Sequence, residues 1–402
     1  MMTAGARQSR RGRPFGALAR SVLPLVLIVS VTVLFSIVWQ SVGEQSDFAT
    51  LERNGVRYIQ ALGPLEIALT NAESVAVNGG SVAPEPLARA VDSAAQVDSE
   101  LRDQLGTQDR WSGLRTKIES LPTGGSGAAV IAAYGGANDL LLALMDKVRN
   151  TSKLIRDPAA DTYYLEDGAA QELPEGIVAA AQYTDLLVSV AKSSAADQGK
   201  ALVDINSARS DLVSNAHDLS DDVRLAVEGT GSRSLGGALL KKLDRFNQSI
   251  DNLVPLMPTA LTGKGSIDTA KVVRARDEMQ SAAADLSAAL LTQIDTALSG
   301  RLSSLGQRRL LAIGTLVVPL LLALVPLGLA LAAWRRRRTA TPAQDRPATP
   351  PPAPALREPP QPVTVPQDPW PVEPVPAHWP EPGAYDASNP EYARWERFGA
   401  PQ

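Results

Sequence analysis

Residues 152–175, SKLIRDPAADTYYLEDGAAQELPE, form the most distinctive stretch of this 402-residue chain. It contains an Asp-Pro junction, two adjacent tyrosines and a Leu-Pro pair. Aspartate is a favoured N-cap because its carboxylate accepts a hydrogen bond from a free backbone N–H, and proline suits the first helical turn. We therefore expect Asp157 and Pro158 to begin a helix and Pro174 to bend it. The stretch predicts a corner between two helices.

Apolar residues recur at helical spacing on both sides of this corner. They predict helices from residue 43 to an Asn-Gly-Gly turn at 78–80, then over 84–105, 130–155, 195–228 and 239–253, and a last long helix from 267. We expect an all-α region of six or seven helices over residues 43–309. At 1.5 Å per residue the last helix would extend roughly 60 Å. Such helices favour an elongated region of two bundles stacked end to end.

The composition excludes several classes of site. Aromatic residues make up 4% of the chain and cysteine is absent, which leaves no disulfide, no thiolate nucleophile and no cysteine metal site. The two histidines, His217 and His378, are too few for a multi-histidine metal site. The net charge of -4 argues against nucleic-acid binding. No catalytic motif is present, so we expect no enzymatic activity, no metal and no cofactor.

Two uncharged apolar segments, residues 21–38 and 310–334, flank the helical region. Each is long enough for a helix to cross about 30 Å of hydrocarbon. Arginines precede the first segment and four arginines follow the second, so the positive-inside rule places both termini in the cytoplasm. The predicted parts are a basic tail (1–20), a first transmembrane helix (21–42), an extracytoplasmic region (43–309), a second transmembrane helix (310–334) and a cytoplasmic segment (335–402).

A cleaved signal peptide is the alternative for the first apolar segment. Ser41, Val42 and Gly43 provide the small residues that a cleavage site needs. The apolar run is longer than the roughly 7–15 residues of a signal-peptide core, so we favour an uncleaved anchor.

The segment after the second apolar run is dominated by proline. Residues 339–402 hold 18 of the chain's 30 prolines, a composition typical of disordered, polyproline-prone spacers. Its end contains Tyr392, Trp395 and Phe398, which suit a short peptide that folds on binding a cytoplasmic protein partner. A solvated spacer is the simpler interpretation.

The stretch at 152–175 resembles a motif of the extracytoplasmic helical sensor domains of bacterial chemoreceptors, histidine kinases and diguanylate cyclases, S-x-L-x-L-D-P-D-x-D-S-Y-Y-L-M-D followed by L-P. The matching residues are Ser152, Leu154, Asp157, Pro158, Asp161, Tyr163, Tyr164, Leu165, Asp167, Leu173 and Pro174. The departures are Arg156, Thr162, Glu166 and the Ala159-Ala160 pair, where the motif has Asp followed by any residue. The resemblance implies a helical-bundle sensor domain held in a bacterial plasma membrane.

The likeness ends after the second apolar segment. Receptors of this kind continue into a HAMP linker and a signalling domain, whereas here four arginines and the proline-rich segment follow. We therefore expect a membrane-anchored, sensor-like signal-transduction protein that acts through a partner, and we expect a homodimer. The alternative is a structural or scaffold protein of the cell envelope whose tail recruits cytoplasmic factors.

Three residues are candidate ligand contacts. Arg209 lies between Ile205 and Leu212 in a predicted apolar seam, where a guanidinium needs an anion. The ligand hypothesis is that this anion is a ligand carboxylate. The simpler interpretation, which we favour, is an edge residue whose charge reaches solvent, or an internal salt bridge to an acidic neighbour such as Asp161 or Asp167. Tyr163 and Tyr164 are candidates for stacking on a ligand, with packing as the simpler role.

The carboxylates of the stretch allow a second hypothesis. Asp161, Glu166, Asp167 and Glu172 carry the oxygen ligands that a hard cation prefers. Their spacing matches no cation-binding loop, so we favour a solvated acidic face and predict no metal site.

Overall fold

A computed structural model describes residues 15–125, 127–156, 160–193, 195–229, 233–257 and 267–339. The chain divides into two compact units, residues 1–337 and 338–402, and the elements below belong to the first. Every regular element in the described part is a helix, which confirms the all-α prediction. The predicted disordered tail, apart from its first residue Thr339, and most of the basic N-terminal tail lie outside the described residues.

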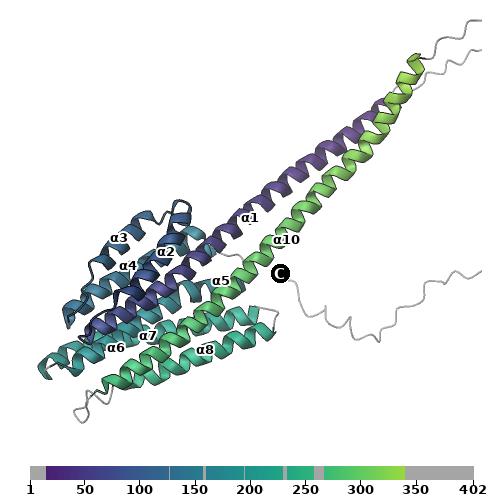
Figure 1. The fold of residues 1–402 in the computed structure, drawn as a ribbon. Coiled ribbons are helices and arrows are strands. Elements are labelled where there is room, and N and C mark those ends of the chain that lie inside the picture. The colour runs from purple at the N-terminus through teal and green to yellow at the C-terminus, as the bar shows by residue number, and fades with distance from the viewer. Residues whose placement is uncertain are drawn as a thin grey trace, which may run out of the picture. The chain divides into compact units, whose positions relative to one another are not determined.

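Two helices are much longer than the rest. Helix α1 spans Phe15–Val77 and helix α10 spans Thr269–Thr339. Each runs without a break from its apolar segment into the bundle, as predicted for the last helix, and both leave the bundle at the same end (Figure 1). Helix α1 ends where the Asn-Gly-Gly turn was predicted, with Gly79 in the left-handed conformation at φ 80°.

The remaining helices form the bundle around these two. Their bounds are α2 Pro84–Leu105, α3 Gln108–Glu119, α4 Ala128–Ser152, α5 Ala160–Asp167, α6 Leu173–Ala191, α7 Ala195–Gly229 and α8 Arg233–Leu253. Short turns are η1 (Leu154–Arg156), η2 (Gly168–Glu172) and η3 (Val254–Leu256). The segment between α2 and α4, for which the sequence predicted no helix, contains α3, whose Trp111 and Leu114 are buried.

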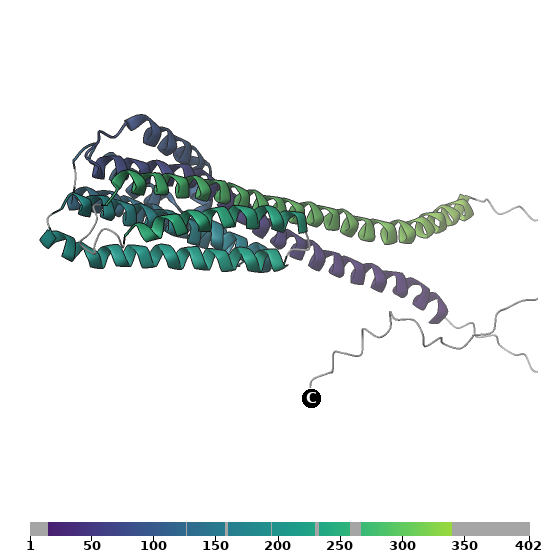
Figure 2. The same ribbon diagram turned by 90° about the horizontal axis from the view of Figure 1, so that it is seen from below.

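The prediction of two bundles stacked end to end is wrong. Helix α1 contacts α2 and α4 as well as α6, while α6 contacts α7 and α7 contacts α8 (Figures 1 and 2). The buried apolar residues of these helices and of α10 form one continuous cluster. The helices therefore lie side by side. Seam spacing shows which face of a helix is buried but does not show which neighbours cover that face.

The predicted helix corner is present, with a detail that the sequence did not indicate. Helix α4 ends at Ser152, and Lys153 takes the left-handed conformation at φ 72°. After α5 the helix widens into a π-helical turn, η2, in which the Leu173 N–H bonds to the Gly168 carbonyl. Pro174 follows at once. A proline removes one N–H and crowds the preceding turn, so the wider turn lets the chain continue as α6 instead of breaking.

Three helices in the described part are long and apolar enough to cross a membrane, namely α1, α4 and α10. They differ in where their apolar side chains lie. In α4, Leu141 and Leu144 are completely buried, and Leu140 and Leu142 pack against the core. Those of the outer parts of α1 and α10 face outward, with Leu34 62% exposed and Leu322 71% exposed. The apolar character of α4 is explained by the bundle core, while that of the other two is not.

Candidate functional site

The structure locates only part of the predicted motif. Asp157 and Pro158 lie outside the described residues, and Asp161 belongs to α5 although its side chain is not described. Leu165 is buried in the core, and so is Pro174 in the first turn of α6. The structural roles assigned to these two residues stay predictions.

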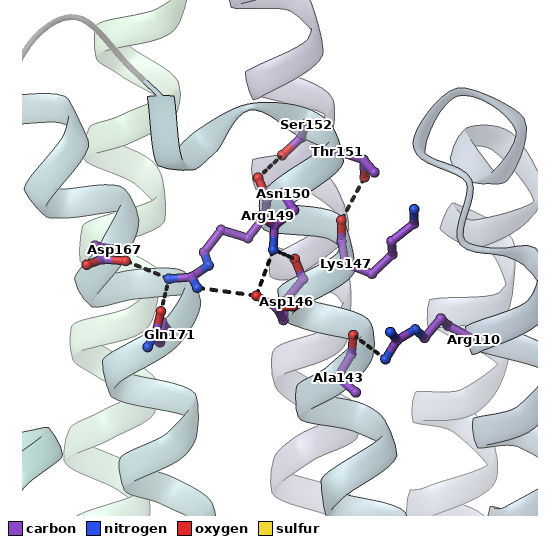
Figure 3. A network of polar contacts seen from close by, with 10 residues as sticks. All are labelled: Arg110, Ala143, Asp146, Lys147, Arg149, Asn150, Thr151, Ser152, Asp167 and Gln171. Atoms are coloured by element: carbon purple, nitrogen blue, oxygen red, sulfur yellow. Dashed lines mark hydrogen bonds and ion pairs between the residues drawn. The ribbon is translucent and has the colours of Figure 1, made fainter.

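Asp167 is held by an arginine that the sequence did not single out. Arg149 on α4 donates from Nη1 to Asp167 Oδ1 at 2.6 Å and also to the Gln171 side-chain oxygen (Figure 3). Its Nη2 contacts Asp146 Oδ1 at 3.3 Å. Both sides of the main ion pair are mostly buried. Arg149 therefore ties the residue before the π-helical turn, and a residue near its end, to α4.

Arg209 lies exposed at the edge of the apolar seam of α7. Steps of three and of four residues both keep side chains on one face of a helix. The buried face of α7 steps by three from Ile205 to Ala208 and then by four to Leu212. The exposed side chain agrees with the simpler interpretation of an edge residue, and Asp167 pairs with Arg149. A role for Arg209 in ligand binding stays a prediction.

Tyr163 and Tyr164 are half-buried and lie edge to face, with ring centroids 5.4 Å apart. The pKa of Tyr163 is raised, mainly by the negative charge of Asp167. Ligand stacking by the tyrosines stays a prediction. Tyr164 packs against the core, in line with the simpler packing role.

The acidic residues near the π-helical turn are not a uniformly solvated face. Glu166 is buried, and burial raises the pKa of Glu172 to about 7, with further contributions from Glu175 and Asp167. Burial likewise raises the pKa of Asp222 on α7 to about 7. Within the described ranges, no group of three or more His, Asp or Glu side chains is arranged to hold a metal ion.

A larger set of buried polar side chains lies where α1, α4, α6 and α10 meet. We call it the polar core, and each of its members is at most 5% exposed. It consists of Glu66, Thr70 and Glu73 on α1, Asn138 on α4, Asp185 on α6, and Arg276 and Gln280 on α10. Polar groups are rarely buried in such number without a structural or functional role, because desolvation is costly.

Hydrogen bonds satisfy only some of these groups. Asn138 Nδ2 donates to Glu73 Oε2 at 2.8 Å, and Gln280 Nε2 donates to Thr70 Oγ1 at 3.0 Å. Arg276 Nη2 donates to Asp277 Oδ1 at 2.8 Å and to Asn71 Oδ1 at 3.3 Å. Among the described residues, Arg276 Nη1 and Glu66 Oε1 make no hydrogen bond. The network therefore retains both an unused donor and an unused acceptor.

Burial shifts the acidic groups of the polar core toward neutral pH. It raises the pKa of Glu73 to about 8, helped by the nearby charge of Asp185 and opposed by Asn138 and Arg276. It raises the pKa of Asp185 to about 7, opposed by Arg276 and by the adjacent Ser74 side chain. Neither oxygen of Asp185 makes a hydrogen bond of ordinary geometry in the described part. The pKa of the completely buried Glu66 is raised well above its usual value.

The polar core is reachable from outside the bundle. An open cavity of about 460 Å³ lies between α1 and α10, lined on one side by Ile67 and Asn71 and on the other by Arg276 and Gln280. Chemically, the arrangement offers one buried cation beside several carboxylates that gain or lose protons near neutrality. It is suited to responding to protons or to a small polar solute by a change in charge.

Arg276 is the functional candidate that the sequence argument missed. The signal was present, because Arg276 lies four residues after Val272 and three before Met279, both in the predicted stripe of the last helix. The reasoning applied to Arg209 selects Arg276 equally well. Spacing cannot separate the two, since only the packing of α10 against α1 buries one of them.

The chain matches no known protein family, no curated protein and no solved structure. The motif at 152–175 therefore stays a resemblance, and the function must be argued from the polar core and the two long helices.

Proposed function

We propose that this is a membrane-anchored signal-transduction protein in which α1 and α10 carry a change in the polar core across the membrane. In this proposal the two helices span the membrane with both termini in the cytoplasm, and residues 43–309 lie outside. The cytoplasmic segment passes the change to a partner protein. The bundle has no catalytic task.

The continuity of α1 and α10 carries the proposal. Both helices contribute to the polar core, and both continue from it into an exposed apolar segment without a break. A helix is stiff along its axis, so a shift at one end is delivered to the other. Thirty-one residues separate Glu73 from Val42 in α1, a path of about 45 Å.

Polar contacts join the two helices at several levels along this path. Farthest from the apolar segments, Arg276 of α10 donates a hydrogen bond to Asn71 of α1, and Gln280 donates one to Thr70. Asp295 pairs with Arg53 at the next level. Arg301 lies 3.4 Å from the buried carboxylate of Glu52 nearer the membrane. Such contacts hold one register between α1 and α10, and a different charge state in the polar core favours a different register.

The membrane placement rests on outward-facing apolar side chains. Val26, Val33 and Leu34 on α1 and Leu310 and Leu322 on α10 are all more than half exposed. A soluble protein rarely exposes so continuous an apolar surface, whereas hydrocarbon covers it at no cost.

Engineered cysteines test the proposal, because the chain has none of its own. Val42→Cys and Ala312→Cys place one thiol on each helix at the membrane end, where both residues are buried. We expect Glu73→Gln to change the rate of disulfide formation between them several-fold, while Arg115→Gln on the exposed face of α3 leaves the rate unchanged. An unchanged rate in both variants favours the scaffold alternative, in which the bundle does not transmit.

A further inference from the structure

The two long helices enclose a second cavity at the end of the bundle nearest the apolar segments. It has a volume of about 670 Å³ and lies between residues 41–48 of α1 and residues 301–308 of α10. We call it the junction pocket. Its basic lining residues are Arg156, Arg301 and Arg308, and its acidic one is Glu44. Arg301 also pairs with Glu52. Three arginines against the carboxylates of Glu44 and Glu52 still leave an excess of positive charge.

Arg156 reaches this pocket because of how the helix corner packs. It ends η1, immediately after the close of α4. At Gly55 of α1 an added Cβ would lie 2.2 Å from Ser152 Oγ and 3.1 Å from a Leu154 methyl, so only glycine lets the corner approach α1 this closely. The resembling motif has leucine at the position of Arg156. Arg156 therefore puts a positive charge at the face of the corner that meets α1 and α10.

An apolar groove continues from the junction pocket along the predicted membrane spans. It has a volume of about 670 Å³ and is lined by Leu34, Phe35 and Val38 of α1 and by Leu311 and Ala312 of α10. Ser41, Gln45 and Arg308 line both the groove and the junction pocket. One elongated ligand can thus occupy the two with a polar end among arginines and an apolar end between the helices.

The boundary between the two cavities has the features of a membrane interface. Phe35 and Trp39 are stacked at 5.5 Å, and the Arg309 guanidinium lies 5.5 Å from the centre of the Trp39 ring. Amphipathic aromatic rings and arginines are enriched at the level of lipid headgroups. Arginine also binds phosphate through paired, charge-assisted hydrogen bonds.

From this geometry we infer that the junction pocket and the groove together bind one anionic phospholipid, with its phosphate among Arg156, Arg301 and Arg308 and an acyl chain between α1 and α10. The inference rests on the membrane placement proposed above. Since the lipid contacts both helices and the helix corner, its occupancy strengthens the register that the polar contacts hold.

The test uses the full-length protein purified in detergent, with native mass spectrometry and thermal unfolding as readouts. Dioleoylphosphatidylglycerol, dioleoylphosphatidylcholine and sodium phosphate are added separately. We expect the phosphatidylglycerol alone to give retained adducts and a higher melting temperature. The double variant Arg156→Gln, Arg308→Gln should bind it about ten-fold more weakly, because it removes two charge-assisted contacts. The four arginines at 335–338 are unchanged in every variant, so only the difference between variants reports on this site.

Two further variants keep the test decisive if the double variant is unstable. Ser41→Trp fills the point that both cavities share without removing a charge, and it should also reduce retention of phosphatidylglycerol. Arg115→Gln removes an exposed arginine of α3 and should leave retention unchanged.

Equal retention in wild type, the double variant and Ser41→Trp overturns the inference. Equal stabilisation by sodium phosphate overturns the lipid assignment in favour of a small anion. If Ser41→Trp changes the mass of the oligomer but not the number of phosphatidylglycerol adducts, the groove is assigned to a second copy of the chain. Release of the protein from membranes by alkaline carbonate contradicts the membrane placement itself, which separates failure of the proposed function from failure of the lipid site.

Discussion

Most proteins bury apolar side chains and expose polar ones, and the two ends of the α1–α10 pair each depart from this distribution in a different way. At the bundle end, polar and charged groups such as Glu66, Glu73 and Arg276 are buried. At the other end, apolar groups such as Leu34 and Leu322 are exposed. The first arrangement costs free energy because polar and charged groups lose their hydration, whereas the second is unfavourable only where water covers the apolar side chains. The comparison supports the proposal that one end changes its charge and the other lies in lipid.

Removing Arg276 should have the largest effect on this comparison. Arg276→Met leaves the buried carboxylates of Glu73 and Asp185 without their nearby cation, and loss of one partner from a buried ionic cluster costs about 3–5 kcal/mol of unfolding free energy. We expect that cost at pH 8 and a smaller one at pH 5, where the carboxylates are protonated. Chemical denaturation of the purified protein at the two pH values measures it. A cost that does not depend on pH contradicts the charge explanation.

A charge in the outer part of α1 should have the next largest effect. Leu34→Arg should oppose membrane insertion by about 2.5–3.5 kcal/mol, the cost of arginine near the centre of a spanning helix. The fraction of protein that resists carbonate extraction measures this. Val203→Arg is the matched control, because Val203 is 74% exposed on α7 of the bundle and its replacement should change nothing. Similar behaviour of the two variants would remove the distinction between the two ends.

The pH dependence of stability should follow the polar core. The folded-state pKa of Glu73, about 8, and that of Asp185, about 7, both lie above the usual values of 4.5 and 3.8. The folded protein therefore holds these protons more tightly than the unfolded chain, and the stability they contribute is lost as pH rises toward 8. We expect the Asp185→Asn variant to lose less of its melting temperature between pH 5 and pH 8 than the wild type, by about 2–4 °C.

A steeper pH dependence in Asp185→Asn than in the wild type would assign the pH-sensitive groups elsewhere. Glu172 and Asp222, whose pKa values are also about 7, are then the next residues to replace.

The exposed contacts should matter least. Arg53→Ala removes the ion pair with Asp295, in which both side chains are more than 40% exposed, and such pairs contribute about 0.2–1 kcal/mol. Arg209→Ala, also on the surface, should change the unfolding free energy by less than about 0.5 kcal/mol. Denaturation curves for both variants check this. A larger effect of Arg209→Ala would restore it as a residue with a buried or bound partner.

Local features of the sequence were enough to predict most of the helices. Apolar spacing gave the helices later found as α2, α4, α7 and α8, and the Asn-Gly-Gly turn gave the end of α1. The two apolar segments also stood out, since apolar character around a whole helix is visible in composition. These properties depend on residues within a few turns of each other, so they can be inferred without knowing the fold.

Properties that depend on distant neighbours came only from the assembled fold. Sequence spacing placed Arg209 and Arg276 in similar apolar stripes, yet α10 packs Arg276 against α1 while α7 leaves Arg209 in solvent. The side-by-side bundle, the clamp of Arg149 on the π-helical turn and the junction pocket likewise join residues far apart in the chain. Helical periodicity records which residues share a face, but burial, pKa and pocket chemistry depend on what the fold places against that face.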